Sequence, residues 1–336
     1  MNRGALKGRR VTIVGAGIGG LTTAIALTRR GASVTVLERA PAIEEVGAGL
    51  QLSPNAMRVL QVLDLQQAVE AVSLRSRAVQ LRDATGAGVV RLDLVGHRPQ
   101  AQFRLVHRAR LIAVLEAAAR RAGVRILLDT PISEPPDDAL VVGADGLHSV
   151  IRRHLNGREV PFFTHQTAWR AVIPDDNPDP VAEIFMGARR HLVSYPLAEG
   201  RRNIVAVQER HDWQAEGWSH ADDPANLRAA FAGFGGPVPR WLAAVDKVHV
   251  WGLFRHPVAP VWQDGRCVLI GDAAHPTLPF MAQGAALAIE DAWTLAACLD
   301  AGTDQDSALV RFQALRRPRV SLSLIHISEP TRPLYI

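Results

Sequence analysis

The pattern of apolar and polar positions at the start of the chain predicts a β-α-β unit. Residues 10–14 and 33–37 are short runs rich in β-branched side chains, which is typical of buried strands. Between them, residues 18–30 combine helical apolar spacing with good helix formers. This unit indicates a nucleotide-binding α/β fold.

The rest of the chain predicts mixed helices and strands first, then mainly strands, and then helices again. The first half continues with a helix at 54–63, a hairpin at 79–94, a helix at 111–121 and strands at 124–128 and 140–142. The middle predicts strands at 167–173, 182–186, 191–195 and 203–208, followed by helices at 226–234 and 238–245. The last third predicts a strand at 267–270 and helices at 283–299 and from 307 towards 319.

These elements predict an α/β protein, in which an antiparallel-sheet domain is inserted into a Rossmann-like nucleotide-binding domain. The Rossmann-like domain would comprise residues 1–165 and 255–320, and the inserted domain 166–254. Residues 321–336, SLSLIHISEPTRPLYI, lack apolar helical spacing and resemble a translated sequencing adapter. We expect this tail to be non-native and not to pack, and the chain to lack its natural C-terminus.

Composition narrows the class of protein. The 336 residues are 48% hydrophobic with a formal net charge of +5, and the arginines are scattered without interleaved aromatics. Such a charge can attract anionic small molecules, and the sequence offers no basic stripe for nucleic acid. Cys267 and Cys298 have no metal-ligand spacing, so we expect no metal and a cytoplasmic location. Glycines interrupt the apolar run after Arg9-Arg10, which argues against a signal peptide, and no run predicts a membrane span.

A glycine-rich turn separates the first strand from the first helix. Gly15, Gly17 and Gly20 have the Gly-x-Gly-x-x-Gly spacing. The first permits a tight turn, the second lets the backbone approach a pyrophosphate, and the third lets the helix pack closely. Glu38 ends the next strand, where a carboxylate can accept hydrogen bonds from a ribose. The unit predicts a dinucleotide site but does not distinguish FAD from NAD.

A second motif favours a flavin. The strand 267–270 leads into Gly271-Asp272, and Gly284 opens the following helix. An aspartate at a strand end can accept a hydrogen bond from a ribityl hydroxyl, and a glycine at a helix start exposes backbone N–H groups to an anion. Alone, such a Gly-Asp pair is more often a turn; its combination with the first motif carries the prediction.

Six segments occur in the order GAGIGGLTTAIAL, VLER, GAGLQLSPNA, HRARL, GADGLHSVIR and GDAAHPTLPFMAQGAALAIEDA. Together they resemble the FAD-dependent aromatic-ring monooxygenases of the salicylate hydroxylase and 3-hydroxybenzoate 6-hydroxylase kind, over about residues 8–320. The resemblance implies that the Rossmann-like part is an FAD-binding domain with non-covalent FAD, that the inserted sheet is a substrate domain, and that the enzyme uses NADH or NADPH and O2. It would hydroxylate a small, phenolic acid-like aromatic through a flavin C4a-hydroperoxide. The enzyme could also form a homodimer.

The resemblance also implies which residues contact the cofactor. They are Gly15, Gly17 and Gly20 at the pyrophosphate, Glu38 with Arg39 at the adenosine ribose, Arg108 at the ribityl-phosphate region, Ile132 at the adenine, Asp145 in a motif linked to FAD and NAD(P)H, Asp272 at the ribityl chain, and Gly284 and Ala285 near the flavin O2 edge. A surface arginine at a helix start is the alternative for Arg108, and a capped structural turn is the alternative for Asp145. The short segment 128–141 suggests a reduced sheet over the adenosine, which bears on Ile132.

The catalytic candidates come from the inserted sheet and from one proline. Pro279 occupies the position of a family proline beside the flavin. His191, Tyr195 and His211 are candidates for a base or an orienting group, because histidine titrates near neutrality. Arg189 or Arg190 could pair with a substrate carboxylate. An ordinary sheet or surface role is the alternative for each of them.

Two other functions stay open from the sequence. One is a related flavoenzyme, such as an epoxidase or a reductase. The other is an FAD-binding protein that is inactive because of its truncated C-terminus.

Overall fold

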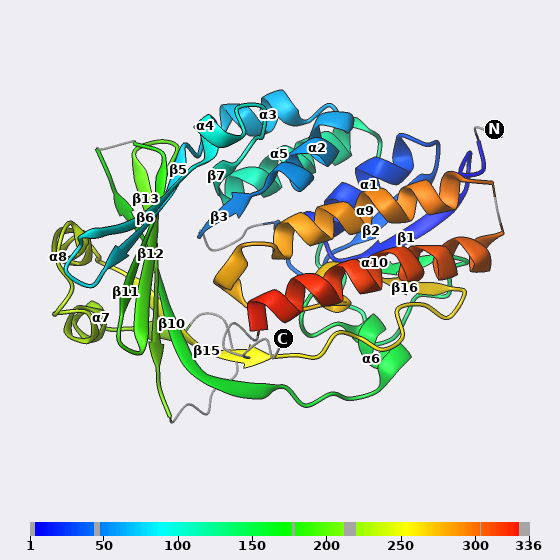
Figure 1. Cartoon of the computed structure of the whole chain (residues 1–336). Helices are drawn as coiled ribbons and strands as arrows, with labels where there is room; N and C mark the ends of the chain where they lie inside the picture. Colours follow the sequence, from blue (N-terminus) through cyan, green and yellow to red (C-terminus); the bar gives the residue numbers. More distant parts are fainter. Residues whose placement is uncertain (1–3, 44–47, 177–178, 212–219, 303, 329–336) are drawn as a thin grey trace, which may run out of the picture.

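The computed structural model describes residues 4–43, 48–176, 179–211, 220–302 and 304–328, with the side chains of the last helix described as far as residue 323. Figure 1 shows two parts: a helix-covered parallel sheet, and a large curved sheet at one side of it. No helix in the described residues is long and apolar enough to cross a membrane.

The parallel sheet is formed by segments from both ends of the chain. Its order is β16-β9-β1-β2-β8, from Cys267–Leu269, Val141–Gly143, Arg10–Val14, Ser33–Leu37 and Arg125–Leu127. All four pairings are parallel. Strands buried on both faces read as apolar, β-branched runs, as β1 does with RVTIV. Their carboxyl ends therefore bring the loops after β1, β9 and β16 to one edge.

Helices cover this sheet, and apolar side chains buried between the helices and the sheet form the main core. The helices are α1 (Ile18–Thr28), α2 (Pro54–Val62), α3 (Gln66–Ala71), α5 (Arg108–Arg121), α6 (Val150–Asn156), α9 (Gly284–Asp300) and α10 (Gln305–Ser328). The long helix α9 packs against α1, α2 and α10. Cys267 and Cys298 are buried free thiols.

The large sheet has the order β14-β15-β10-β13-β12-β11-β5-β6. Its strands are His220–Asp222, Val248–Arg255, Phe162–Pro174, Arg201–Glu209, Arg190–Leu197, Val181–Gly187, Ala78–Asp83 and Gly88–Asp93. All pairings are antiparallel except that of β11 with β5. The hairpin β5–β6 thus extends the sheet beyond residues 166–254. Helices α7 (Pro224–Ala230) and α8 (Val238–Ala243) lie on the outer face (Figure 1), so the other face turns towards the parallel sheet.

A three-stranded sheet lies between these parts. Its order is β3-β7-β4, from Gly49–Leu52, Arg104–His107 and Ser73–Arg75, and the short helix α4 (Leu94–His97) follows β6. Leu105 of β7 packs in one apolar cluster with Ala182, Tyr195 and Leu197 of the large sheet. This contact joins the inner face of the large sheet to the rest of the molecule.

The structure confirms the predicted bounds of β1 and β2 and the 79–94 hairpin, and it corrects the predicted end of the last helix. We expected this helix to end near Arg319, but α10 continues to Ser328 with Pro318 inside it. Val320 is fully buried in the main core cluster, whereas Leu322, two residues later, is exposed. That residues 321–336 are non-native and do not pack stays a prediction.

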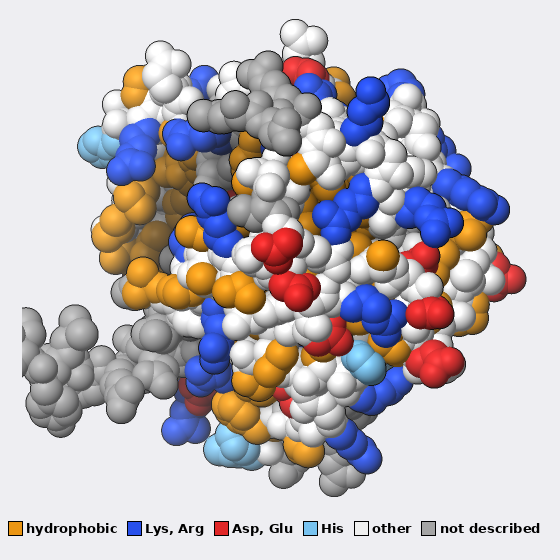
Figure 2. All heavy atoms as spheres, turned by 90° about the vertical axis from the view of Figure 1, so that its right-hand side faces the viewer, with side chains coloured by type: hydrophobic (Ala, Val, Ile, Leu, Met, Phe, Trp, Pro, Cys, Tyr) orange, Lys and Arg blue, Asp and Glu red, His pale blue; other side chains and the backbone are white. Residues whose placement is uncertain are grey.

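The basic side chains do not gather into one stripe on the face shown in Figure 2. Lysine and arginine side chains are spread over that face with acidic and apolar side chains between them.

Candidate functional site

A cavity of about 2030 Å³ runs from the carboxyl edge of the parallel sheet to the inner face of the large sheet. Its lining includes the turn after β1, the end of β2, the loops after β9 and β16, the start of α9 and the strands β10 to β13. Pockets for drug-sized ligands usually measure about 300 to 1,000 Å³. The cavity therefore has room for a dinucleotide and a second, smaller molecule.

Each of the three glycines in the turn after β1 is needed for a different reason. Gly15 has φ +100°, and a Cβ there would lie 2.4 Å from the carbonyl oxygen of Ala144. A Cβ on Gly20 would lie 2.0 Å from the carbonyl oxygen of Gly15, so this glycine permits close packing of α1. A Cβ on Gly17 would meet nothing within 4 Å, because Gly17 borders the cavity. Free N–H groups at the start of α1 thus face open space, as phosphate binding requires.

Glu38 is held in place by the backbone. Its Oε2 accepts a hydrogen bond of 2.8 Å from Ala16 N, and its Oε1 accepts one of 3.0 Å from Ala40 N. A carboxylate has about four acceptor positions, so both oxygens retain capacity for a ribose hydroxyl. Arg39 follows as an exposed residue of the cavity lining.

Asp272 and Arg108 meet at the cavity although they come from distant segments. Asp272 follows β16 in a 3-10 turn, Gly271–Ala273, and Arg108 is the first residue of α5. The Asp272 side chain is open to the cavity but deeply enclosed by its walls, and this enclosure raises the pKa of Asp272, while the charge of Arg108 acts to lower it. Arg108 is half-buried and lines the cavity, which disfavours the alternative of a surface arginine.

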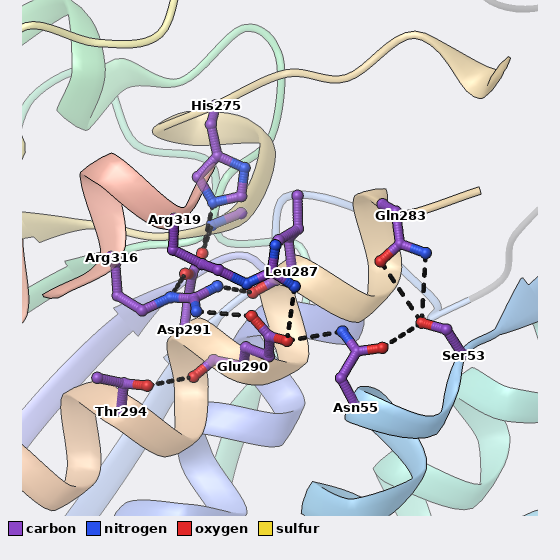
Figure 3. A network of polar contacts seen from close by, with 11 residues as sticks. Ser53, Asn55, His275, Gln283, Leu287, Glu290, Asp291, Thr294, Arg316 and Arg319 are labelled. Carbon is purple, nitrogen blue, oxygen red and sulfur yellow. Dashed lines mark hydrogen bonds and ion pairs between the residues drawn. The ribbon is translucent and has the colours of Figure 1, made fainter. Parts of the chain in front are cut away.

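A buried polar network, centred on Asp291 outside the cavity lining, holds the Gly271-Asp272 turn in place (Figure 3). The carboxylate of Asp291 in α9 accepts hydrogen bonds from Gly271 N at 3.0 Å and Arg316 Nε at 2.6 Å, and its Oδ2 lies 2.5 Å from His275 Nε2. Burial raises the pKa of Asp291, but His275, Arg316 and the Gly271 N–H outweigh it and lower the pKa to about 2. Arg316 is in α10, so the last helix is fastened to the turn that carries Asp272.

The network continues from Asp291 to its neighbour Glu290 and on to the start of α2. Glu290 accepts hydrogen bonds of 2.6 Å from both Arg316 and Asn55, and Asn55 contacts Ser53 before α2 (Figure 3). Sequence reasoning included Glu290 and Asp291 in a family motif but assigned them no role. Adjacent acidic residues in a buried helix were the available signal, because buried carboxylates require partners.

Asp145 caps a helix. Its carboxylate accepts a hydrogen bond from Ser149 Oγ at 2.5 Å and one from Val150 N at 2.7 Å, at the start of α6. Burial raises the pKa of Asp145 in spite of these bonds. The residue also borders the cavity, so the geometry combines the capped turn with a position at the site.

Three further candidates for cofactor binding line the cavity. Gly284 begins α9, where a Cβ would lie 2.6 Å from Thr277 Oγ1, and Ala285 follows it. Ile132 lies in the segment 128–140, which contains no strand, in keeping with the predicted shortening.

His191 and Tyr195 project from β12 towards the cavity, and Pro279 lies on its opposite wall. The ring centroid of His191 is 5.9 Å from that of Phe280, and burial lowers the pKa of His191. Tyr195 is 4% exposed, and its burial raises the pKa of the phenol far above neutrality. His191 is therefore the group of this pair that can exchange a proton near neutral pH.

The structure places the other candidates differently. His211 is exposed and outside the cavity lining, with its ring 6.1 Å from that of His165. Arg189 and Arg190 line the cavity, but each already has a partner: Arg189 forms an exposed ion pair with Glu209, and Arg190 donates to the carbonyl oxygen of Ala230 in α7.

Sequence reasoning missed Arg170. It lines the cavity from β10 with its guanidinium 4.6 Å from the centre of the Trp251 ring. The alternation of Trp169 and Arg170 in a predicted strand was the signal that could have placed it on the inner face.

Comparisons with known proteins agree with this geometry. Residues 9–139 and 137–324 match the family described as FAD binding domain. The chain is 36% identical to the 3-amino-4-hydroxybenzoate 2-monooxygenase PtmB3 of Streptomyces platensis, over 93% of this chain and 85% of that protein. It is 34% identical to the 3-hydroxybenzoate 6-hydroxylase of Klebsiella oxytoca, again over 93% and 85%. The crystal structure of CtdE in complex with FAD and substrate 4 shares the fold, with a TM-score of 0.86, 22% identity, and coverage of 95% of this chain and 88% of that one.

The fold and the site define a flavoprotein oxidoreductase. The chain belongs to the family of FAD-dependent aromatic monooxygenases, as its family match and its relatives show.

Proposed function

We propose that this monooxygenase hydroxylates a small phenolic acid, with NADH or NADPH and O2 as co-substrates. The observation that carries the proposal is one continuous cavity, which joins a dinucleotide cradle to a sheet wall bearing the half-buried His191. The hydroxybenzoate and aminohydroxybenzoate named for two relatives support this class of substrate.

Our proposal assigns the cofactor contacts to the residues of the cradle. Gly15, Gly17 and Gly20 would hold the pyrophosphate and Glu38 the adenosine ribose. The ribityl chain would be held by Asp272 with Arg108, the flavin edge by Gly284 and Ala285, and the adenine by Ile132. Bound FAD supplies hydride acceptance from NAD(P)H and transfer of one oxygen atom from O2.

His191 is the proposed base. A neutral imidazole can accept the proton of a phenol, and burial keeps His191 neutral by lowering its pKa. The resulting phenolate is a stronger nucleophile at its ring carbons. Tyr195, which keeps its proton, would orient the substrate by donating a hydrogen bond.

Arg170 is the proposed partner of the substrate carboxylate, in place of Arg189 and Arg190. It pairs in register with Val205, and Val205 pairs with Val193, which is beside His191 on the same face of the sheet. Two strand spacings of about 4.8 Å thus separate the strands of Arg170 and His191. This separation suits an aromatic acid whose two polar groups lie at opposite ends of its ring.

We propose that the enzyme works in the cytoplasm. Its two cysteines are free thiols, and the nicotinamide co-substrate belongs to a reducing compartment.

The test is a screen of hydroxybenzoates for stimulated NAD(P)H consumption, with identification of the product. A hydroxylated product formed in step with NAD(P)H consumption is expected. In His191→Asn the rate should fall and lose its rise with pH, while FAD affinity stays unchanged. Bound FAD without stimulated NAD(P)H consumption by any phenol would contradict the proposal.

A further inference from the structure

Beyond His191, the cavity face of the large sheet becomes apolar. Met186 of β11 pairs with His191 of β12, and Ile184 pairs with Val193. All four side chains line the cavity. The lining residues contributed by β11, β5 and β6 are all uncharged.

The apolar face continues to the edge of the sheet. Val79 of β5 pairs with Ala182 of β11, and Leu92 of β6 pairs with Val79. Three strand spacings separate β12 from β6, which is about 14 Å at roughly 4.8 Å each. This distance exceeds the length of a single aromatic ring, so a small phenol beside His191 would leave much of this face uncovered.

The exposed apolar side chains lie at the two ends of this face. Met186, beside His191, is 38% exposed, and Leu92, on the edge strand β6, is 49% exposed. By contrast, Val79, Ala182 and Val193 pack in a cluster with Leu105 of the small sheet. Exposed apolar side chains inside a cavity are typical of a ligand-binding surface.

The ion pair of these strands lies on their other face. Arg82 and Glu183 form an ion pair at 2.8 Å, and Arg82 lies over the ring of Phe185 in the cluster under α7 and α8. Asp83, at the end of β5, pairs with Met186 but is outside the cavity lining, so the lining residues of β5 and β11 are apolar. Leu94 and Phe103 add to the cavity lining near β6.

We propose that Ile184, Met186 and Leu92, with Leu94 and Phe103, form a substrate subsite for an apolar substituent, such as an alkyl or prenyl chain on the phenolic ring. The inference rests on the proposed function, because His191 fixes the position of the ring. Met186 pairs with His191, and Ile184 and Ala182 follow Met186 on the same face of β11. From Ala182 the apolar face continues through Val79 to Leu92, so a chain on the ring can follow it to the edge at β6.

The test compares two ligands that differ only in the apolar chain, 4-hydroxybenzoate and 3-hexyl-4-hydroxybenzoate. Binding is measured from the change in flavin absorbance of the FAD-loaded protein, so hydroxylation is not required. Each fully buried methylene tightens binding by about fourfold. The hexyl acid should bind more tightly by a factor on the order of ten or more, because part of the chain stays in water.

Two variants of β6 locate the subsite. Leu92→Asp places a charge in the subsite and should reduce the preference for the hexyl acid to less than about threefold. Val89→Asp is the matched control, because Val89 is 55% exposed on the same strand but outside the cavity lining. It should leave the preference unchanged.

Equal binding of the two acids, failure of both to bind, or equal effects of the two variants would overturn the inference. So would a dimer that Leu92→Asp dissociates while the preference persists, since the strip would then be an interface with a second copy. Tight binding of the hexyl acid without hydroxylation would contradict the proposed function but support the subsite. Hydroxylation of both acids with equal affinity would support the proposed function but contradict the subsite.

Discussion

Arg316 donates a hydrogen bond of 2.6 Å from its Nε to the carboxylate of Asp291, and both side chains are buried. Because Asp291 also accepts from Gly271 N, the pair connects the last helix to the turn that presents Asp272. The cofactor site of this enzyme therefore depends on a contact between α9 and α10, outside the cavity.

Arg316→Met should destabilise the protein and weaken FAD binding together. The change leaves Asp291 and Glu290 buried without their cationic partner, and breaking a buried pair typically costs about 3 to 5 kcal/mol. Denaturant unfolding and FAD titration measure the two effects. Arg319→Met is the control, because Arg319 is 44% exposed and lies 3.4 Å from Glu290, so it should cost less than about 1 kcal/mol. Similar losses in both variants would rule out a special role for the buried pair.

The stability of the protein should fall as pH drops through the acidic range because of Asp291. Its pKa in the folded state is lowered to about 2, whereas an unfolded aspartate titrates near 3.9. The stabilisation is present above the unfolded pKa and is lost as pH falls from about 4 to 2, and a shift of this size corresponds to roughly 2 to 3 kcal/mol. Unfolding free energies measured across this range, for the parent and for Asp291→Asn, test the assignment. An identical pH dependence in the two proteins would refute it.

Asp272→Ala should weaken FAD binding by about 1.5 to 3 kcal/mol, because it removes a hydrogen bond to a charged group. Folding should change little, since the Asp272 side chain is open to the cavity. The measurement is the FAD dissociation constant at fixed salt, with thermal unfolding of the apoprotein as the control. An affinity like that of the parent would mean that the ribityl chain is held elsewhere.

Gly17→Val and Gly20→Val should fail in different ways. A side chain on Gly17 enters open space in the cavity, so this variant should fold with the melting temperature of the parent apoprotein and lose FAD. A Cβ on Gly20 meets the carbonyl oxygen of Gly15 at 2.0 Å, so this variant should be unstable even without cofactor. Melting curves of the two apoproteins separate the cases. Retention of FAD by Gly17→Val would show that the pyrophosphate does not approach this turn.

Replacing Glu38 by arginine should weaken FAD binding as well. The substitution removes the carboxylate that accepts from Ala16 N and Ala40 N and puts a donor where a ribose needs an acceptor. Glu38→Gln is the milder comparison, because it keeps one acceptor oxygen. The expected order of FAD affinity is parent, then Glu38→Gln, then Glu38→Arg, and any order in which Glu38→Arg binds as well as the parent contradicts the assignment.

Local patterns predicted the elements that are buried on both faces. Strands β1 and β2 were bounded correctly because parallel strands between helix layers are apolar throughout. Strand β15, Val248–Arg255, was missed because the alternation of its first residues stops at Val250, where four consecutive residues, 250–253, are buried. The small sheet β3-β7-β4 was missed because its strands are three or four residues long and pair only after the chain has folded.

Contacts between distant segments were beyond local patterns. The meeting of Arg108 with Asp272, and of Asp291 with Arg316, depends on how helices pack, and helix packing leaves no periodic signal in a single segment. The motif spacing nevertheless placed Gly15, Glu38 and Asp272 at one cavity, because the carboxyl ends of parallel strands share an edge.

Strand β16 joins the edge of a sheet whose centre is β1, so the two walls of the cofactor cradle come from opposite ends of the chain. A ribosome releases the glycine turn early and the Gly271-Asp272 turn late, and α10 later still. The nascent chain thus carries half a cradle for most of its synthesis. A complete cofactor cradle can therefore form only after the Gly271-Asp272 turn has been synthesised and β16 has joined the parallel sheet.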